Sequence, residues 1–174
     1  MMETFRGTYT VMVTAFNKDG QLDLNAQAQF TEWQVQQGIH GLIPLGSTGE
    51  FLSLSAEERC AVAKCVIDTT AGRVPVLVGA GAESTDDVIT NVKMAEDLGA
   101  DGTMIIPPFY STPTWDELIH HFGRISEASN RPVMIYNNPA TANVDLTPQL
   151  VSELSKLENI DYIKESTMDV TRIR

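Results

Sequence analysis

The sequence predicts an α/β fold built on parallel strands, and three observations lead to that prediction. Residues that favour β-strands alternate with helical stretches along the whole chain. The β-type runs are short and apolar without polar alternation, as expected for parallel strands that helices cover. No linker, low-complexity tract or shift in composition divides residues 1–174, so we expect one α/β domain with right-handed crossovers.

The strands and the helices between them can be placed in order. Strands are expected at residues 9–14, 41–45, 74–79, 102–106, 133–137 and 162–164. Helix starts are marked by a hydroxyl residue that stands three positions before an acid or directly before a proline, at Ser55, Ser84, Thr114 and Thr147. Glycines that would end the first three helices in a left-handed conformation stand at Gly38, Gly72 and Gly99.

Two architectures fit this alternation, an open doubly wound sheet and a (β/α)8 barrel. The open sheet usually brings a glycine-rich phosphate or dinucleotide loop, but Gly79-Ala80-Gly81-Ala82 lacks the third glycine of such a loop. The sequence therefore favours the barrel. Six strands and five helices cannot close a barrel that typically needs around 250 residues. We therefore expect the chain to be truncated on its C-terminal side, with residues 169–174 beginning a further helix.

Composition excludes several classes of function. The net charge is −11 and there is no basic cluster, which argues against a nucleic-acid partner. No apolar run approaches the roughly 20 residues of a membrane span, and residues 1–6 lack the apolar stretch of a secretory signal. We therefore expect a soluble, cytoplasmic protein. Neither the two cysteines nor the three histidines have metal-ligand spacing, so we expect no metal and no cofactor; these residues are Cys60, Cys65, His40, His120 and His121.

Lys164 is the first candidate for catalysis, because it lies in the short β-type run Tyr162-Ile163-Lys164-Glu165-Ser166. A lysine held in an apolar strand loses part of its hydration, which lowers its pKa and leaves some neutral amine that can attack a ketone. The alternative is a strand-end lysine whose ammonium reaches solvent or pairs with Glu165.

Other polar groups follow the ends of the predicted strands. Ser47 and Thr48 follow the second strand, Tyr110 follows the fourth and Tyr136 ends the fifth, and in a parallel barrel these carboxyl ends converge on one face. The N–H groups and hydroxyls of residues 46–50 suit a small carboxylate, and a tyrosine hydroxyl beside an amine can shuttle protons. Each feature also has a purely structural explanation, namely an ordinary glycine-containing turn and tyrosines that pack in the core or at a subunit interface.

Four ordered motifs resemble the dihydrodipicolinate synthase and N-acetylneuraminate lyase superfamily. They are Gly46-Ser47-Thr48-Gly49-Glu50, Pro108-Phe109-Tyr110, Tyr136-Asn137-Asn138-Pro139 and Ile163-Lys164-Glu165, and the likeness runs from about residue 7 to residue 164. The resemblance implies a (β/α)8 barrel and a class I lyase, in which Lys164 forms an imine with pyruvate or another 2-oxo acid. A protonated imine is an electron sink, so such a lyase requires no metal.

The resemblance also implies roles for the remaining site residues. Tyr136 would relay protons and orient the ligand, while Ser47, Thr48 and Gly49 would hold the substrate carboxylate. Tyr110 would reach into the neighbouring subunit's site and be linked to that site's tyrosine through the Ser47 hydroxyl. A homo-oligomer follows, at least a dimer and commonly a tetramer.

Departures from the family pattern bear on the substrate. Thr141 stands where dihydrodipicolinate synthases usually carry an arginine for the second substrate's carboxylate, and a neutral hydroxyl cannot form that bidentate pair. Ser47 and Ser166 also occur in relatives that act on 2-keto-3-deoxy sugar acids. We therefore expect a lyase, aldolase or dehydratase for pyruvate or a hydroxylated 2-oxo acid, with dihydrodipicolinate synthase as the nearest rival activity.

Two alternatives belong to other classes. A partial barrel with unpaired strand edges could associate without catalysing anything. An open-sheet binding module resembling a response-regulator domain would carry an acidic cluster after the first strand, where this chain has Thr14-Ala15-Phe16.

Overall fold

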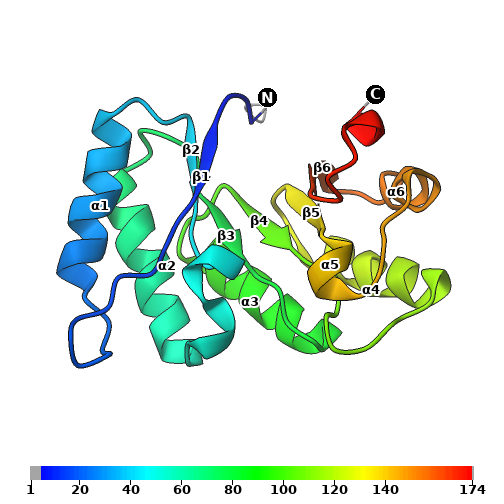
Figure 1. The fold of residues 1–174 in the computed structure, drawn as a ribbon, viewed down its shortest axis with the longest axis horizontal. Coiled ribbons are helices and arrows are strands. Elements are labelled where there is room, and N and C mark those ends of the chain that lie inside the picture. The colour runs from blue at the N-terminus through cyan, green and yellow to red at the C-terminus, as the bar shows by residue number, and fades with distance from the viewer. Residues whose placement is uncertain (1–4, 174) are drawn as a thin grey trace. The chain divides into compact units, whose positions relative to one another are not determined.

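A computed structural model describes residues 5–173 and confirms the α/β class (Figure 1). Strands and helices alternate along the chain, with short 3-10 turns after β2 and β6. The strands are β1 (Tyr9–Val11), β2 (Gly41–Ile43), β3 (Leu77–Gly79), β4 (Gly102–Ile105), β5 (Val133–Asn137) and β6 (Ile160–Glu165). The helices are α1 (Leu24–Gln36), α2 (Ala56–Thr70), α3 (Thr85–Asp97), α4 (Trp115–Ala128), α5 (Pro139–Ala142) and α6 (Pro148–Leu154). The 3-10 turns are η1 (Ser47–Gly49), η2 (Phe51–Ser53) and η3 (Val170–Ile173).

Every predicted strand is present, but the boundaries differ for local reasons. β5 matches its prediction, β6 extends further in both directions, and β1 to β4 are shorter than expected. β2 ends where Pro44 follows Ile43, since proline has no N–H to donate. β3 begins late because the N–H of Val76 donates to a carboxylate oxygen of Asp101 at 2.8 Å instead of to a neighbouring strand.

The chain forms two compact units. The first comprises residues 97–101 and the chain up to Gly79, with β1, β2, β3, α1 and α2. β1 and β2 pair in parallel, with Tyr9 opposite Gly41, and Leu42 of β2 bridges to Val76 just before β3. α1 and α2 run side by side beside these strands (Figure 1).

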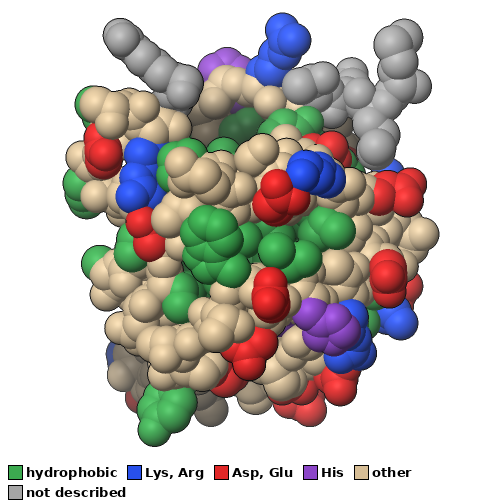
Figure 2. All heavy atoms as spheres, turned by 90° about the vertical axis from the view of Figure 1, so that its right-hand side faces the viewer, with side chains coloured by type: hydrophobic (Ala, Val, Ile, Leu, Met, Phe, Trp, Pro, Cys, Tyr) green, Lys and Arg blue, Asp and Glu red, His purple; other side chains and the backbone are tan. Residues whose placement is uncertain are grey.

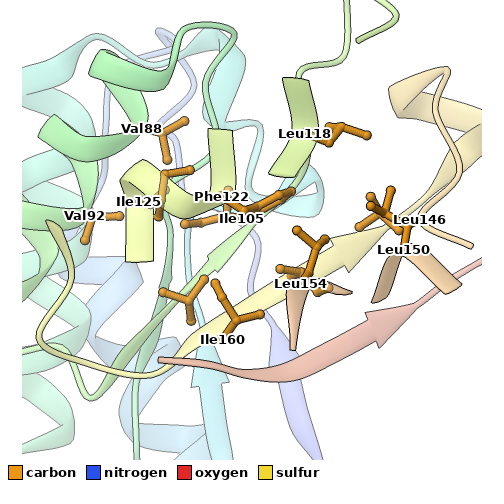
Figure 3. Packing of buried hydrophobic residues seen from close by; sticks show 13 residues of the cluster. Val88, Val92, Ile105, Leu118, Phe122, Ile125, Leu146, Leu150, Leu154 and Ile160 are labelled. Atoms are coloured by element: carbon orange, nitrogen blue, oxygen red, sulfur yellow. The ribbon is translucent and has the colours of Figure 1, made fainter. Parts of the chain in front are cut away.

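The second unit comprises residues 80–96 and 102–174, of which 174 lies outside the described part. β4, β5 and β6 pair in parallel in that order. α3, α4 and α6 contribute apolar side chains to one cluster with these strands, and Figure 3 shows those side chains pointing toward one another. The labelled members are Val88, Val92, Ile105, Leu118, Phe122, Ile125, Leu146, Leu150, Leu154 and Ile160.

Side chains alternate across a strand, so the packing of β5 decides where its polar end points. Ile135 is 1% exposed and belongs to the cluster under the helices. Tyr136, the next residue, therefore projects from the opposite face of the strand, away from that cluster.

The predicted helix punctuation is confirmed. Ser55 and Thr114 both form reciprocal capping boxes, Ser84 Oγ accepts from the N–H of Asp87, and Thr147 accepts from the N–H of Leu150 ahead of Pro148. Gly38, Gly72 and Gly99 have φ values of +82°, +70° and +91°, as the left-handed ends required. The left-handed residue that directly ends α2 is Ala71 at φ 51°, however, and Gly72 follows it.

Two details near the end of the chain were not predicted correctly. The segment after β5 is the one-turn helix α5, with Pro139 as its first residue and Asn143 at φ 58° ending it. Residues 170–173 form the 3-10 turn η3 in place of the start of an α-helix, and Arg174 lies outside the described residues.

Charge and cysteine features are unremarkable in the described part of the chain. None of its helices is long and apolar enough to cross a membrane. Among residues 5–173, no three His, Cys, Asp or Glu side chains gather as a metal ion would require, and both cysteines are free thiols. On the face drawn in Figure 2, acidic and basic side chains are interspersed around a small group of apolar ones.

Candidate active site

Lys164 and Tyr136 lie side by side at the ends of β6 and β5. The two residues are paired in the parallel register, and the Lys164 Nζ lies 3.9 Å from the centroid of the Tyr136 ring. Tyr136 is 7% exposed and Lys164 is half-buried, so the amine rests on an aromatic face with limited access to water. The structure thus brings these two predicted site residues together.

The phenol of Tyr136 has a fixed partner from its own segment. Asn138 Nδ2 donates to the Tyr136 hydroxyl oxygen at 2.9 Å. Because that oxygen accepts from Asn138, its own proton remains available to a second group. Asn138 stands two residues beyond Tyr136, and the sequence analysis did not single it out as a site residue.

Asn137, the residue after Tyr136, connects the ends of β5 and β6 through hydrogen bonds. Its side chain is fully buried and its Nδ2 donates to Asp145, to the Leu146 carbonyl and to Glu165 Oε2 at 3.1, 3.3 and 3.0 Å. Its Oδ1 accepts from the Leu146 N–H at 2.9 Å, and its carbonyl accepts from the Ser166 N–H at 2.9 Å. This network fixes the register that places Lys164 beside Tyr136.

The structure does not contain the alternative ion pair between Lys164 and Glu165. Burial by itself would raise the pKa of Glu165, but hydrogen bonds from Asn137 and Thr167 lower it. One carboxylate oxygen accepts from Asn137 and the other from the N–H of Thr167 at 2.7 Å. Glu165 therefore belongs to the hydrogen-bond network around Asn137, on the face of β6 opposite to Lys164.

Tyr110 lies in a loop whose backbone is held tightly while its side chain is free. The side chain is 90% exposed and projects into solvent, so within this chain it is not packed onto the lysine and tyrosine pair. The carboxylate of Glu83 accepts hydrogen bonds from the N–H groups of Phe109, Tyr110 and Ser111 and from the Ser111 hydroxyl. Burial alone would raise the pKa of Glu83, but these hydrogen bonds hold it at about 2.

A groove of about 580 Å³ lies beside this loop, and its lining includes Ser111, Thr85 and His121. His121 is 5% exposed, and its Nδ1 lies 2.8 Å from the Thr85 hydroxyl. Burial is the main cause that lowers the pKa of His121 to about 4, with a further contribution from the charge of Arg124. The groove is thus backed by a neutral imidazole at neutral pH.

The residues predicted to bind a carboxylate form a 3-10 turn in the first unit. Ser47 and Thr48 are exposed, Gly49 is buried, and Thr14 Oγ1 donates to the Gly49 carbonyl at 2.7 Å. Leu45, directly before the turn, is 1% exposed and has φ 61°, a conformation that costs a leucine strain energy. Because this turn and the Lys164 pair belong to different units, the predicted convergence of Ser47 and Thr48 on Lys164 and Tyr136 stays a prediction.

Sequence reasoning missed three residues that shape these features, namely Asn138, Glu83 and Leu45. A signal existed for Asn138, because it stands two residues after Tyr136 and shares its face in an extended segment. No local pattern marks Glu83 as the partner of residues 26 to 28 positions away, or Leu45 as left-handed.

Comparison with known proteins gives a consistent result. Residues 4–174 match the model of the dihydrodipicolinate synthetase family. The chain is 40% identical over 169 residues to the 4-hydroxy-tetrahydrodipicolinate synthase of Nitrobacter hamburgensis, covering 97% of this chain and 57% of that protein.

Solved structures agree with the sequence comparison. The dihydrodipicolinate synthase of Acinetobacter baumannii, complexed with pyruvate, has TM-score 0.95 and 37% identity, over 97% of this chain and 58% of that one. The prophage protein YagE of E. coli K12, also in complex with pyruvate, has TM-score 0.94 and 38% identity, over 98% and 58% of the two chains. These comparisons confirm the predicted resemblance and the predicted barrel class. The chain spans less than two thirds of the length of these relatives.

Proposed function

Because the chain belongs to the dihydrodipicolinate synthetase family, we propose that the protein is a Schiff-base lyase acting on pyruvate or another 2-oxo acid. Lys164 is the nucleophile of this proposal and Tyr136 its proton relay. The observation that carries the proposal is the in-register contact between them, with the amine 3.9 Å from the ring centroid.

The chemistry requires an amine that attacks the C2 ketone, loses water and becomes a protonated imine. Proton transfers accompany each of these steps, and a positioned phenol speeds them when it lies within hydrogen-bond reach. The protonated imine then accepts the electron pair left when a C3–H or adjacent C–C bond breaks, which gives a neutral enamine. The hydrogen bond from Asn138 supports the relay role, because it orients the Tyr136 oxygen and leaves its proton free to move.

We propose that Ser47, Thr48 and Gly49 hold the substrate carboxylate. The first N–H groups of a helical turn lack partners within the turn, and the hydroxyls of Ser47 and Thr48 are exposed. The strained left-handed conformation of Leu45 supports a functional role for this turn, since such strain tends to be retained at ligand-binding sites.

The proposal extends to assembly. Tyr110 has 90% of its side chain exposed on a loop with a fixed backbone, which suits a residue that acts in another copy of the chain. We therefore propose a homo-oligomer, a dimer or tetramer, with Tyr110 near the subunit interface. The cytoplasm is a separate proposal for its location.

Two alternative activities differ in the substrate on which the enzyme would act. Thr141, exposed on α5, offers no positive charge for a second carboxylate, which favours a hydroxylated 2-oxo acid such as a 2-keto-3-deoxy sugar acid. The name of the Nitrobacter relative favours the alternative, condensation of pyruvate with aspartate semialdehyde to hydroxytetrahydrodipicolinate. A panel of both substrates with the full-length protein separates the two, because only the condensation consumes pyruvate together with the semialdehyde.

The mechanism itself is tested by trapping. Full-length protein is mixed with pyruvate, reduced with borohydride and digested, and we expect the mass of a reduced pyruvate adduct on the peptide that contains Lys164. Lys164→Met should abolish the adduct. Lys156→Met is the matched control, since Lys156 is exposed and pairs with Glu153 on the surface, and it should leave the adduct intact. No adduct on Lys164 in the wild-type protein would reject the mechanism.

A further inference from the structure

One carboxylate gathers four hydrogen bonds from the loop that carries Tyr110. Glu83 Oε2 accepts from the N–H groups of Phe109 and Tyr110 at 2.9 and 3.0 Å. Glu83 Oε1 accepts from the N–H and the hydroxyl of Ser111 at 3.0 and 2.6 Å. Three successive N–H groups that point to one place form an anion-binding concavity, and here the protein's own carboxylate fills it.

The same loop is held from a second element. Asn143, the residue that ends α5, donates from Nδ2 to the Phe109 carbonyl at 3.0 Å. The backbone around Tyr110 is therefore tied both to the segment just before α3 and to the segment that follows β5. Fixing a backbone costs conformational entropy, and this loop places on the fixed backbone a side chain that is 90% exposed.

We propose that Glu83 is a positioning residue for Tyr110, fixing the loop so that the Tyr110 hydroxyl is presented in one geometry to the reaction. This inference rests on the proposed Schiff-base function and on the role that the family resemblance implies for Tyr110, whose hydroxyl would be linked to the Tyr136 relay of a neighbouring copy of the chain. A relay hydroxyl works only within roughly 2.6–3.2 Å of its partner, and a displacement of about 1 Å can cost a hundredfold in rate. Without the carboxylate, residues 109–111 would lose four of the hydrogen bonds that fix the direction of Tyr110.

Burial alone would raise the pKa of Glu83, but these hydrogen bonds lower it to about 2, so the carboxylate is ionised near neutral pH. Protonation of Glu83 therefore does not weaken its hydrogen bonds to residues 109–111 near neutral pH. The role of Glu83 has to be tested by substitution, because a change of pH near neutrality does not break these bonds.

The test is a double-mutant cycle with a readout that needs no second substrate. Full-length wild-type protein, Glu83→Gln, Tyr110→Phe and the double variant are compared by the exchange of pyruvate C3 hydrogen for deuterium in heavy water. Imine and enamine formation produce this exchange, and proton NMR follows it at several pyruvate concentrations. We expect Glu83→Gln to lower kcat by between about tenfold and a hundredfold with little change in KM, and to have no further effect once Tyr110 is Phe.

The matched control is Glu96→Gln, which alters the same chemistry at a loop that carries no proposed site residue. Glu96 accepts from the Ser129 hydroxyl and from the backbone and side-chain nitrogens of Asn130, before β5 begins. We expect its exchange rate to equal that of the wild type. Should Glu83→Gln fail to fold, as judged by urea unfolding, Ser111→Ala replaces it in the cycle. This milder variant removes the hydroxyl bond alone, and we expect a several-fold loss that also vanishes in the Tyr110→Phe background.

The outcomes are distinct from those that test the proposed function. If the wild type forms the borohydride adduct but Glu83→Gln exchanges as fast as the wild type, the positioning role is wrong. Equal fractional losses with and without the Tyr110 hydroxyl would also overturn it, as would full exchange by Tyr110→Phe. Absence of an adduct on Lys164 is the separate result that rejects the Schiff-base function.

Discussion

Acidification should destabilise the protein through His121 well before most carboxylates titrate. His121 lies on α4 with 5% of its surface exposed, and its pKa falls from 6.5 to about 4. Burial is the largest cause, and the nearby charges of Arg124 and His120 act in the same direction, whereas Glu83 opposes them. The difference between 6.5 and about 4, at 1.36 kcal/mol per pKa unit, amounts to about 3 kcal/mol.

The sign follows from which state binds the proton. Above about pH 6.5 the imidazole is neutral in both the folded and the unfolded chain, so it contributes no pH dependence. Between about pH 6.5 and pH 4 the unfolded chain binds a proton that the folded chain does not. The free energy of unfolding therefore falls as the pH falls through this window, and the loss is complete below about pH 4.

The measurement is urea unfolding of the full-length protein at a series of pH values from 7 to 4, for the wild type and His121→Asn. Asparagine can keep a polar atom near the Thr85 hydroxyl but does not titrate. We expect the stability advantage of the wild type over this variant to shrink by about 3 kcal/mol across the series. His120→Asn, at an exposed position on the same helix, is the matched control; it removes only the smallest of the causes named for His121 and should lose nearly as much stability as the wild type. If His121→Asn and the wild type lose stability in parallel, the argument from burial is refuted.

Two further predictions concern how the backbone supports the site. A Cβ at Gly79 would lie 2.1 Å from the Leu45 carbonyl oxygen, so Gly79→Ala should displace Leu45, the strained residue before the 3-10 turn. We expect the substitution to lower the free energy of unfolding by about 1–3 kcal/mol and to slow pyruvate exchange. Gly123→Ala, on α4 with nothing within 4 Å, should instead stabilise by up to about 1 kcal/mol, and a loss there would contradict the reasoning. Asn137→Ala leaves the buried Leu146 N–H without its partner, so urea unfolding should show a loss of at least about 1–3 kcal/mol, and an unchanged midpoint would contradict it.

Much of the fold was predictable because its signals are local. A hydroxyl that caps a helix and an acid three residues later act within one turn, and Ser55 and Thr114 behave as their spacing predicts. The helix α5 was missed because four residues are too few to show a helical period. The late start of β3 depends on Asp101, 25 residues from Val76, and no pattern around Val76 reveals that hydrogen bond.

The candidate site likewise has features that local sequence predicts and features that depend on distant residues. Residue type and position at strand ends identified Lys164 and Tyr136, but their contact depends on the register of β5 and β6. That register includes an irregularity between Val133 and Met134, and it is fixed by the buried amide of Asn137. Sequence reasoning counts positions along one strand and has no access to the offset between two strands. The family resemblance supplied what the pattern alone could not.

Individual acidic residues have structural roles that the net charge does not reveal. A net charge of −11 argues against a nucleic-acid partner, but it says nothing of what the carboxylates do. Glu83, Glu96 and Glu117 each accept backbone N–H groups of a loop or helix start. Burial alone would raise the pKa of Glu83 and Glu96, but side-chain and backbone hydrogen bonds lower the pKa of all three. Each contact stabilises the ionised form, so acids that make the net charge negative also order loops around the strands. Of these three acids, only Glu83 holds a loop with a proposed catalytic side chain, which is why Glu83→Gln should change the chemistry and Glu96→Gln should not.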